Sequence, residues 1–292
     1  ITNFFHMISI NPKEIPTSKL HGYLLGAVAP RPIAFASTID EKGTPNLSPF
    51  SFFNVFGSNP PTMIFSPARR VRGNTTKHTL QNVEKIKEVV INVVNYDIVQ
   101  QMSLSSSEYP VGVNEFEKAG FTMLASDEVK PFRVAESPVQ FECKITDIIY
   151  TGDKGGAGNL IVCEVLKIHI HETVLNEDGM IDQHKIDLVA RAGGSYYTRA
   201  RDGFFEIQKP IFTLGIGVDQ IPSEIRNSSV LTGNNLGMLG NVAFLPTAED
   251  VDNFAKEHPE LIGLEMVKKH TFAQQYLEKN DVESAWKVLL LK

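Results

Sequence analysis

The chain has 292 residues, of which 42% are hydrophobic and 21% are charged, as is typical of a globular protein with a sizeable core. Its net charge of −6 argues against a nucleic-acid-binding surface as the main function, because such surfaces are usually basic. No apolar run approaches the roughly 20 residues needed to span a bilayer, so we expect neither a nucleic acid nor a membrane as partner.

Residues 1–19 are expected to form an N-terminal arm, in which Met7 is a candidate for the native first residue. The arm lacks a charged start followed by an apolar run, so no signal peptide is predicted. The two cysteines, Cys143 and Cys163, lie in strand-like runs. So few cysteines without an export signal predict a cytoplasmic protein, and we favour two packed side chains over a redox dithiol.

The segment from Pro30 to Asn54 is the most informative part of the chain. Its first part, Ile33–Ile39, is rich in β-branched and aromatic residues, and the acidic-Gly sequence of residues 40–43 then predicts a hairpin turn. The second part alternates Ser and Asn with Phe, from residue 48 to residue 54. Short polar groups beside aromatic faces suit a flat, polar-edged ligand better than plain core packing.

The pattern from Ile33 to about Lys209 is mostly β. Further strands are predicted at Thr62–Ser66, Val89–Val94, Val139–Tyr150 and Leu160–Thr173. An amphipathic helix is predicted over Thr76–Lys87, with Asn74, Thr75 or Thr76 as its cap, and a second helix near Val113–Ala119. Several strands with few helices favour a barrel or sandwich over a parallel sheet.

Two other motifs in this region have plain structural interpretations. The glycine-rich run at residues 152–158 is followed by a strand rather than a helix, so we interpret it as a hairpin connection and not a nucleotide loop. His169 and His171 share one face of a strand, but Glu164 and Glu172 have the wrong parity to complete a metal site there. An exposed strand face is the favoured interpretation.

After Pro210 the character of the sequence changes. Ile211–Gln220 is predicted to be extended, Ile221–Met238 to be loop-rich, and Thr247–His258 to begin as a capped helix. Leu261–Lys292 predicts one or two amphipathic helices. We expect residues 211–292 to be a C-terminal extension that packs on the barrel or on a partner subunit.

A basic cluster lies at the start of the helix predicted from Thr76. Residues 68–79 hold four cations, a histidine and three threonines. Because a helix N-terminus offers free N–H donors, Lys77 with Thr76 or Thr79 could bind a phosphate. The spacing is not that of a nucleoside-triphosphate loop, so a phosphate monoester is the better hypothesis than ATP. A solvated basic loop with an N-cap is the alternative.

A third cluster, from Ala190 to Tyr197, contains paired glycines followed by Ser195 and two tyrosines. Paired glycines allow a close backbone approach, and tyrosines supply aromatic area with polar tips. A simple Gly-Gly turn beside core tyrosines is the alternative. Nothing along the chain predicts a catalytic triad.

These clusters, in this order, resemble the flavin reductase-like, FMN-binding split-barrel family of the flavoredoxin type. The resemblance covers roughly Leu20 to Pro210. The matching segments are VAPRPIAFASTIDEKGTPNLSPFSFFN, NPPTMIFSP, TKHTLQN, VVINVVN, EYPVGVNEFEKAGF, VKPFRVAESPVQFECKI and ARAGGSYYTR. It implies a mainly β fold, a split β-barrel over residues 20–210 with a few helices and a partly helical C-terminal extension, with non-covalent FMN and a homodimer that holds the cofactor near the subunit interface.

The resemblance also implies which residues contact the cofactor. Along the flavin ring and its side chain it implies Ser37, Thr38, Asn46, Leu47, Ser48, Ser51, Phe52, Phe53 and Asn54. Around the phosphate it implies Ser66, Lys77, His78 and Thr79, and over the ring or a nicotinamide site the group with Gly193, Gly194 and Tyr196. The family usually has Asp where this chain has His78, which could serve as an extra phosphate donor.

The resemblance implies an NAD(P)H-dependent reductase that passes electrons through FMN to free flavin or another small acceptor. Hydride transfer to a flavin requires close stacking more than a protein nucleophile, which agrees with the lack of a strong acid–base pair. The alternatives are a non-catalytic FMN-binding electron carrier and a barrel that has lost the flavin.

Overall fold

The structure is a computed structural model that describes residues 7–207 and 214–292. It divides into two compact units, and the division falls between Phe204 and Phe205. Each unit has its own hydrophobic clusters and is described by itself.

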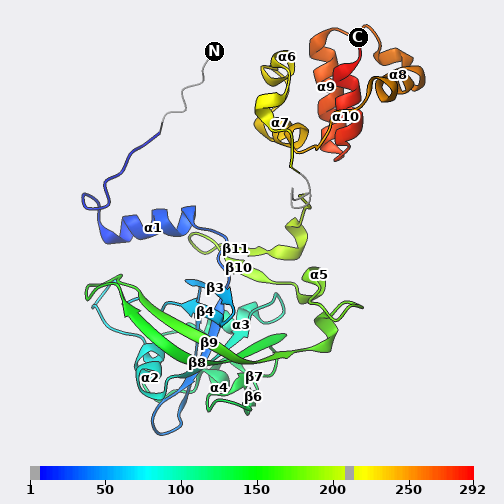
Figure 1. Cartoon of the computed structure of the whole chain (residues 1–292). Coiled ribbons are helices and arrows are strands. Elements are labelled where there is room, and N and C mark those ends of the chain that lie inside the picture. The colour runs from blue at the N-terminus through cyan, green and yellow to red at the C-terminus, as the bar shows by residue number, and fades with distance from the viewer. Residues whose placement is uncertain (1–6, 208–213) are drawn as a thin grey trace. The chain divides into compact units, whose positions relative to one another are not determined.

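The first unit is built on a seven-stranded sheet in the order β2-β1-β5-β8-β9-β4-β3, in which all neighbours are antiparallel (Figure 1). Its strands are β1 (Ala34–Ile39), β2 (Pro45–Phe50), β3 (Phe53–Ser58), β4 (Pro61–Phe65), β5 (Glu88–Val93), β8 (Val139–Tyr150) and β9 (Asn159–Ile170). Two small ladders pair β6 (Met123–Leu124) with β7 (Arg133–Val134) and β10 (Val189–Arg191) with β11 (Tyr197–Arg199).

The two edge strands of this sheet, β2 and β3, are consecutive in the chain. Only Ser51 and Phe52 separate them, yet no ladder joins them among the described residues. The sheet therefore curls until its edges meet at a connection of two residues, and it stays open there. We call this opening between β2 and β3 the split.

Alternation along β1 and β2 places residues on two different cores. Ala36 of β1 belongs to the inner cluster, which also holds Phe65, Ile91 and Leu80. Phe35 belongs to the outer cluster beneath two short helices. Because side chains alternate along a strand, residues next to each other in β1 and β2 point into opposite cores.

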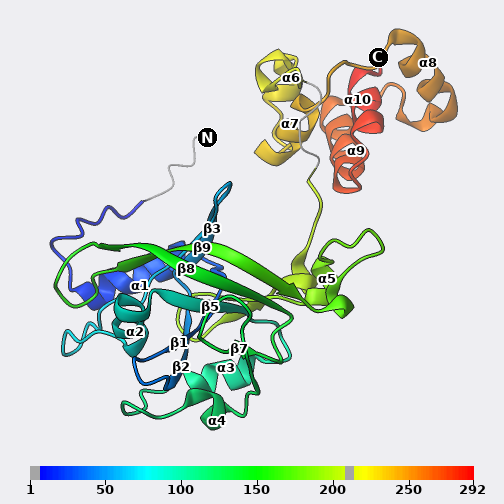
Figure 2. The ribbon, with the colours of Figure 1, turned by 60° about the horizontal axis from the view of Figure 1, so that its bottom comes forward.

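The helices of the first unit are α1 (Thr17–Ala27), α2 (His78–Ile86), α3 (Val99–Ser105), α4 (Glu115–Ala119) and α5 (Gln183–Ile186), with short 3₁₀ turns at Glu172–Val174 and Ala200–Gly203. The sequence pattern indicated α2 and α4 but not α1 or α3. Figures 1 and 2 show β8 and β9 running together as the longest strands of the unit, with α2 near one end of them.

Three details of the predicted elements are wrong. The helix predicted from Thr76 begins at His78, and its N-cap, Lys77, makes no side-chain capping bond. The three proposed capping side chains bind elsewhere: Asn74 to Arg69 and to the glycine-rich loop, Thr75 to Arg70, and Thr76 to Gln81.

The third detail concerns the strand predicted to continue to Thr173. It ends at Ile170, because the His171 side chain accepts from the Thr173 N–H and starts a 3₁₀ turn. The glycine-rich run does connect β8 to β9, as predicted. Cys143 and Cys163 are also packed as predicted; both are buried in the inner core, where burial raises the pKa of Cys143 to about 12 and that of Cys163 well above its usual value.

The second unit is helical. It contains α6 (Ser223–Arg226), α7 (Gly233–Gly240), α8 (Ala248–Glu257), α9 (Met266–Glu278) and α10 (Val282–Leu290), with 3₁₀ turns at Val218–Gln220 and Pro259–Leu261. Its core surrounds the fully buried Trp286, whose indole N–H donates to the Leu239 carbonyl.

The helices α8, α9 and α10 confirm the predictions for Thr247–His258 and Leu261–Lys292. The loop-rich prediction for Ile221–Met238 is wrong, because the segment holds α6 and most of α7, which a Thr232–Asn235 capping box begins. The extended prediction for residues 211–220 falls partly outside the described residues, and its end, Val218–Gln220, is a 3₁₀ turn. No helix in the described ranges is both long and apolar enough to cross a membrane.

Candidate functional site

A hollow of about 230 Å³ lies at the split. Five of the predicted site residues line it, namely Ser48, Ser51, Phe52, Ser66 and Lys77. The remaining lining residues are His21, Leu25, Pro49, Phe50, Ala68 and Ser106. The split thus brings the end of β2, the end of β4, the start of α2 and one side of α1 to a single opening.

The start of α2 forms the polar end of this hollow. No side chain caps the helix, and the N–H groups of His78 and Thr79 have no hydrogen-bond partner among the described residues. Lys77 at the N-cap is half-buried and lines the hollow. Free N–H groups beside a cation form a site for an anion, and the side chains that could have blocked it bind elsewhere.

Ser66 lines the same hollow. Its Oγ accepts a hydrogen bond from the Asn159 N–H at 3.0 Å, and its own N–H donates to the Phe52 carbonyl at 2.9 Å. A hydroxyl that accepts from the backbone keeps its own proton to donate. Ser66 can therefore offer a fixed donor to an anion held near Lys77.

The charge at this end is partly balanced by an exposed carboxylate. The Arg70 Nε lies 2.7 Å from the Glu108 Oε1, and the Lys77 Nζ lies 4.0 Å from the same oxygen. Burial and the neighbouring Arg70 lower the pKa of Lys77, which Glu108 raises in part. The hydrogen bond and charge of Arg70 lower the pKa of Glu108. One carboxylate thus faces two cations, and the cluster retains positive charge.

Thr38, Asn46 and Thr79 form a buried network beside the hollow. The Asn46 Nδ2 donates to the Thr79 Oγ1 at 3.1 Å and lies 3.4 Å from the Thr38 Oγ1, which also accepts from Asn82. The Thr79 hydroxyl is engaged in this network, and the residue is only 1% exposed and does not line the hollow.

Ser37 and Leu47 have no access to the hollow through their side chains. Both are fully buried on the opposite face of the strands, where Leu47 packs in the outer core. The Leu47 N–H donates to the Glu115 carboxylate at 3.1 Å, and burial raises the pKa of Glu115. Alternation along β1 and β2 therefore divides a continuous predicted set between the two faces.

Phe53 and Asn54 lie on β3, just past the split. Phe53 packs against the inner core, and the Asn54 Oδ1 accepts from the N–H of Val55. Neither lines the hollow. Phe52, directly before them, does line it, so the aromatic run divides within two residues.

The glycine pair also lies away from the hollow. It forms the turn between β10 and β11, where the Tyr196 N–H donates to the Gly193 carbonyl and Gly194 has φ 58°. A Cβ on Gly193 would lie 3.3 Å from the Cα of Gly26 in α1. The pair thus permits the approach of α1, while Tyr196 is 78% exposed.

A second hollow, of about 210 Å³, lies between the β1–β2 turn, α2 and residues 111–113. It is lined by Asn46 and His78 of the predicted set, together with Asp40, Glu41, Gln81, Asn82 and Lys85 among others. Lys77 and His78 are adjacent in the chain but line different hollows, so α2 begins between the two.

Sequence reasoning missed His21 and Leu25, because no helix was predicted over Thr17–Ala27. It also missed Ser106, which lines the first hollow. The signal that could have found α1 is the spacing of Leu20, Tyr23, Leu24 and Ala27, although none of its residues is buried.

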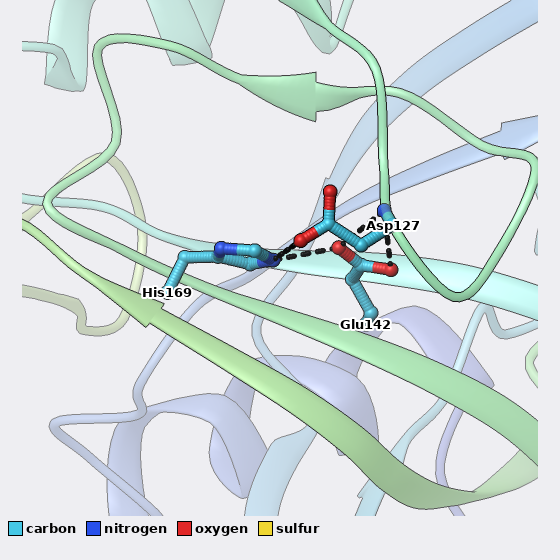
Figure 3. A group of neighbouring side chains, drawn as sticks. All are labelled: Asp127, Glu142 and His169. Atoms are coloured by element: carbon cyan, nitrogen blue, oxygen red, sulfur yellow. Dashed lines mark hydrogen bonds and ion pairs between the residues drawn. The ribbon is translucent and has the colours of Figure 1, made fainter.

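His169 belongs to a cluster on the outer side of β8 and β9 (Figure 3). Its Nε2 lies 2.6 Å from the Glu142 Oε1 and 4.0 Å from the Asp127 Oδ2. Glu142 also accepts from the N–H groups of Asp127, Glu128 and Val129. The expectation of an exposed strand face is wrong for His169, because a buried carboxylate from β8 lies beneath it.

This cluster has ligand types that suit a metal ion, but its contacts are those of a charge network. Lys167 pairs with Asp127 at 2.7 Å, and the Arg133 Nε lies 3.8 Å from the Glu142 Oε1. Burial raises the pKa of Glu142, but the N–H donors and His169 outweigh it and hold this pKa below its usual range.

Comparison with known proteins identifies the family. The sequence pattern of the flavin reductase like domain matches residues 26–190, which is more than half of the chain. The chain is a member of the flavin reductase-like family. An uncharacterized protein of Aquifex aeolicus is 39% identical over 188 residues, 64% of this chain and 93% of that protein. The family match ends before the helical unit begins.

Two solved structures are similar in fold to this chain. Nitrilotriacetate monooxygenase component B from Bacillus cereus is 27% identical, with a TM-score of 0.65 over 69% of this chain and 99% of that one. The split barrel domain of a Shewanella frigidimarina protein is 24% identical, with a TM-score of 0.57 over 68% of this chain and 95% of that one. The predicted mainly β split-barrel fold is confirmed. The family places the chain among flavin-related redox proteins.

Proposed function

We propose that the chain binds FMN non-covalently at the split and acts as an NAD(P)H-dependent flavin reductase. The observation that carries this proposal is that Ser66 and Lys77, the N-cap of the uncapped helix α2, line the same hollow. The walls of the hollow are aromatic and hydroxyl-bearing, from Phe52 to Ser48. A planar ring that ends in a phosphate fits this division into a flat wall and an anion site.

The residues present fit such a ligand in a specific way. Lys77 would hold the phosphate, and Ser66 would donate to it. Ser48, Ser51 and Phe52 would lie along the ring and its side chain. Bound FMN would supply the two-electron redox chemistry that side chains do not provide. The protein would orient it and limit access of water.

Mixing the flavin-loaded protein with NADH or NADPH without oxygen tests this function. A reductase loses the visible absorption of oxidised flavin with at least one donor. A protein that keeps its flavin oxidised with both donors is not a reductase, and the electron-carrier alternative then applies. A protein whose titration with FMN gives no quenching of flavin fluorescence does not bind FMN, and the whole proposal fails.

We also propose that two copies of the chain associate through the first unit. Large apolar side chains are exposed on two of its strands, among them Phe56 on β3 and Leu166, Ile168 and Ile170 on β9. Exposed apolar groups in such numbers mark association surfaces, and identical copies most often pair about a two-fold axis. Replacement of Ile168 by Asp should convert a dimer in sedimentation experiments into a monomer. An unchanged mass would contradict this surface, and a monomeric wild type would contradict the dimer.

A further inference from the structure

We propose that Arg31 is the positioning residue that fixes helix α1 as a wall of the hollow, and that α1 is held there by this buried guanidinium rather than by apolar packing. The proposal rests on the proposed function for its ligand, FMN, but its central structural claim can be tested without flavin. Arg31 itself does not line the hollow, whereas His21 and Leu25 of α1 do.

Helix α1 lacks the apolar anchor that usually holds a surface helix. None of its eleven residues is buried, and Tyr23 and Leu24 are largely exposed. Its N-cap, Pro16, makes no side-chain capping bond. A helix in a globular protein gains most of its stability from packing an apolar face, so another interaction must hold this one in place.

The guanidinium of Arg31 supplies that interaction. Its Nη1 donates to the carbonyl of Leu25 at 2.7 Å and also to that of Val28, both at the C-terminal end of α1. Unpaired carbonyls and the negative end of the helix dipole lie there, so a cation is favourable. Arg31 is only 6% exposed, and no carboxylate lies within ion-pair distance of it among the described residues. Helix carbonyls therefore accept the hydrogen bonds of the guanidinium in place of a carboxylate.

The same side chain joins α1 to two other segments. Its Nη2 donates to the Ala192 carbonyl at 3.2 Å, and its Nε lies 3.5 Å from the Ser51 Oγ at the split. The Arg31 backbone pairs with Arg191 at 2.8 and 2.9 Å. One planar group thus fixes the end of α1, the glycine turn and the connection between β2 and β3 relative to one another.

Two contacts show that α1, which Arg31 binds at its C-terminal end, lies against the barrel. The His21 ring meets the Phe52 ring edge-on at 6.4 Å, and Gly26 approaches Gly193 closely enough that a Cβ on Gly193 would lie 3.3 Å away. His21 and Phe52 both line the hollow. Release of the C-terminal end of α1 would therefore remove one wall of the hollow and leave the start of α2 intact.

The test compares Arg31→Met and Arg31→Lys with a matched control, Arg133→Met. Arg133 also donates to a loop carbonyl, that of Ala125, and does not line the hollow. The first readout is amide hydrogen exchange over residues 17–28 in the flavin-free protein. We expect faster exchange there in Arg31→Met. The increase should be smaller in Arg31→Lys, because lysine keeps the positive charge but lacks the planar guanidinium that donates to several carbonyls at once. Arg133→Met should show no increase.

The second readout is the dissociation constant of FMN, which we expect to rise about tenfold in Arg31→Met and to stay unchanged in Arg133→Met. Unchanged exchange over residues 17–28 in Arg31→Met overturns the proposal. Faster exchange with unchanged FMN affinity would refute the claim that α1 is a wall of the FMN-binding hollow. A wild type that binds no FMN refutes the proposed function, while the exchange result still decides the role of Arg31.

Should Arg31→Met fail to fold, Gly193→Ala keeps the proposal open to refutation. The added Cβ presses on Gly26 and should displace the same end of α1 while the guanidinium stays in place. Faster exchange confined to residues 17–28 together with weaker FMN binding supports α1 as a wall of the hollow. Exchange that rises equally over the barrel strands, or not at all, opposes it.

Discussion

Two places in the first unit direct main-chain N–H groups at a negative charge, and they differ in who supplies that charge. In the loop before β7, the N–H groups of residues 127–129 all donate to the chain's own Glu142. At the start of α2, the N–H groups have no acceptor among the described residues, and a lysine stands beside them. The first site is complete without a ligand, and under the proposed function a bound phosphate completes the second. A closed anion site serves stability, and an open one serves binding.

Removal of the internal anion should have the largest effect. In Glu142→Ala, three N–H groups lose their buried acceptor and His169 loses its partner, so we expect a loss of about 3 kcal/mol in the free energy of unfolding. Urea unfolding measures it. Glu142→Gln keeps the shape of the side chain but places an NH₂ donor opposite the N–H donors of the loop, so it should recover only part of the lost stability. A loss below about 1 kcal/mol would mean that water replaces the carboxylate readily.

The matching experiment at the open site should affect binding and not stability. Lys77→Ala should weaken FMN by about 1.5–3 kcal/mol, the value of a charge-assisted hydrogen bond, with little change in unfolding. Lys85→Ala is the control, because Lys85 lies on the same helix but lines the second hollow. Fluorescence titration gives both constants. If Lys85→Ala weakens FMN binding and Lys77→Ala does not, the phosphate binds in the second hollow.

The sequence predicted the open site better than the closed one. A basic run before an amphipathic helix can be recognised locally, because the donors, the cation and the helix start lie within a few residues. Glu142 is 13 to 15 residues from the loop that it binds and 27 from His169, so only the pairing of β8 with β9 brings the three together.

The fold followed from the sequence where periodicity is strong, and the site did not follow residue by residue. A resemblance assigns the same role to every residue of a run such as Asn46–Leu47–Ser48. In a strand, however, successive side chains point to opposite faces and so into opposite cores. Leu47 therefore falls in the outer core, and the glycine pair at residue 193 faces α1. Helix α1 was missed although Leu20, Tyr23, Leu24 and Ala27 recur at helical spacing.

Acid should weaken the closed site. The folded state holds the pKa of Glu142 below its usual range, so its ionised form stabilises the protein at and above neutral pH. That contribution is lost as the pH falls below the unfolded value of about 4.3 towards the lower folded value. We expect the free energy of unfolding to fall over this window by at most about 1.4 kcal/mol per pH unit from this group. The decline should be shallower in Glu142→Gln, and parallel curves would exclude Glu142 as its source.

The smallest effect concerns the carboxylate that stands closest to the open site. Glu108 faces both Arg70 and Lys77 from an exposed position, so it competes with any phosphate for their charge. Glu108→Gln should tighten FMN roughly two- to fivefold at low salt, and the gain should fade as salt screens the exposed charges. The control, Glu177→Gln, changes net charge equally in the turn between Leu175 and Ile181 and should leave affinity unchanged.

Weaker binding of FMN in Glu108→Gln would contradict this competition. It would mean that Glu108 acts as Glu142 does, as an internal anion that orients Arg70 for the ligand rather than an anion that the phosphate must outcompete. The two roles differ in their dependence on salt. Orientation through the 2.7 Å contact with Arg70 is short-range and persists at high ionic strength, whereas competition for charge does not. Titration of both variants at two salt concentrations therefore decides whether the start of α2 is an open site or a partly closed one.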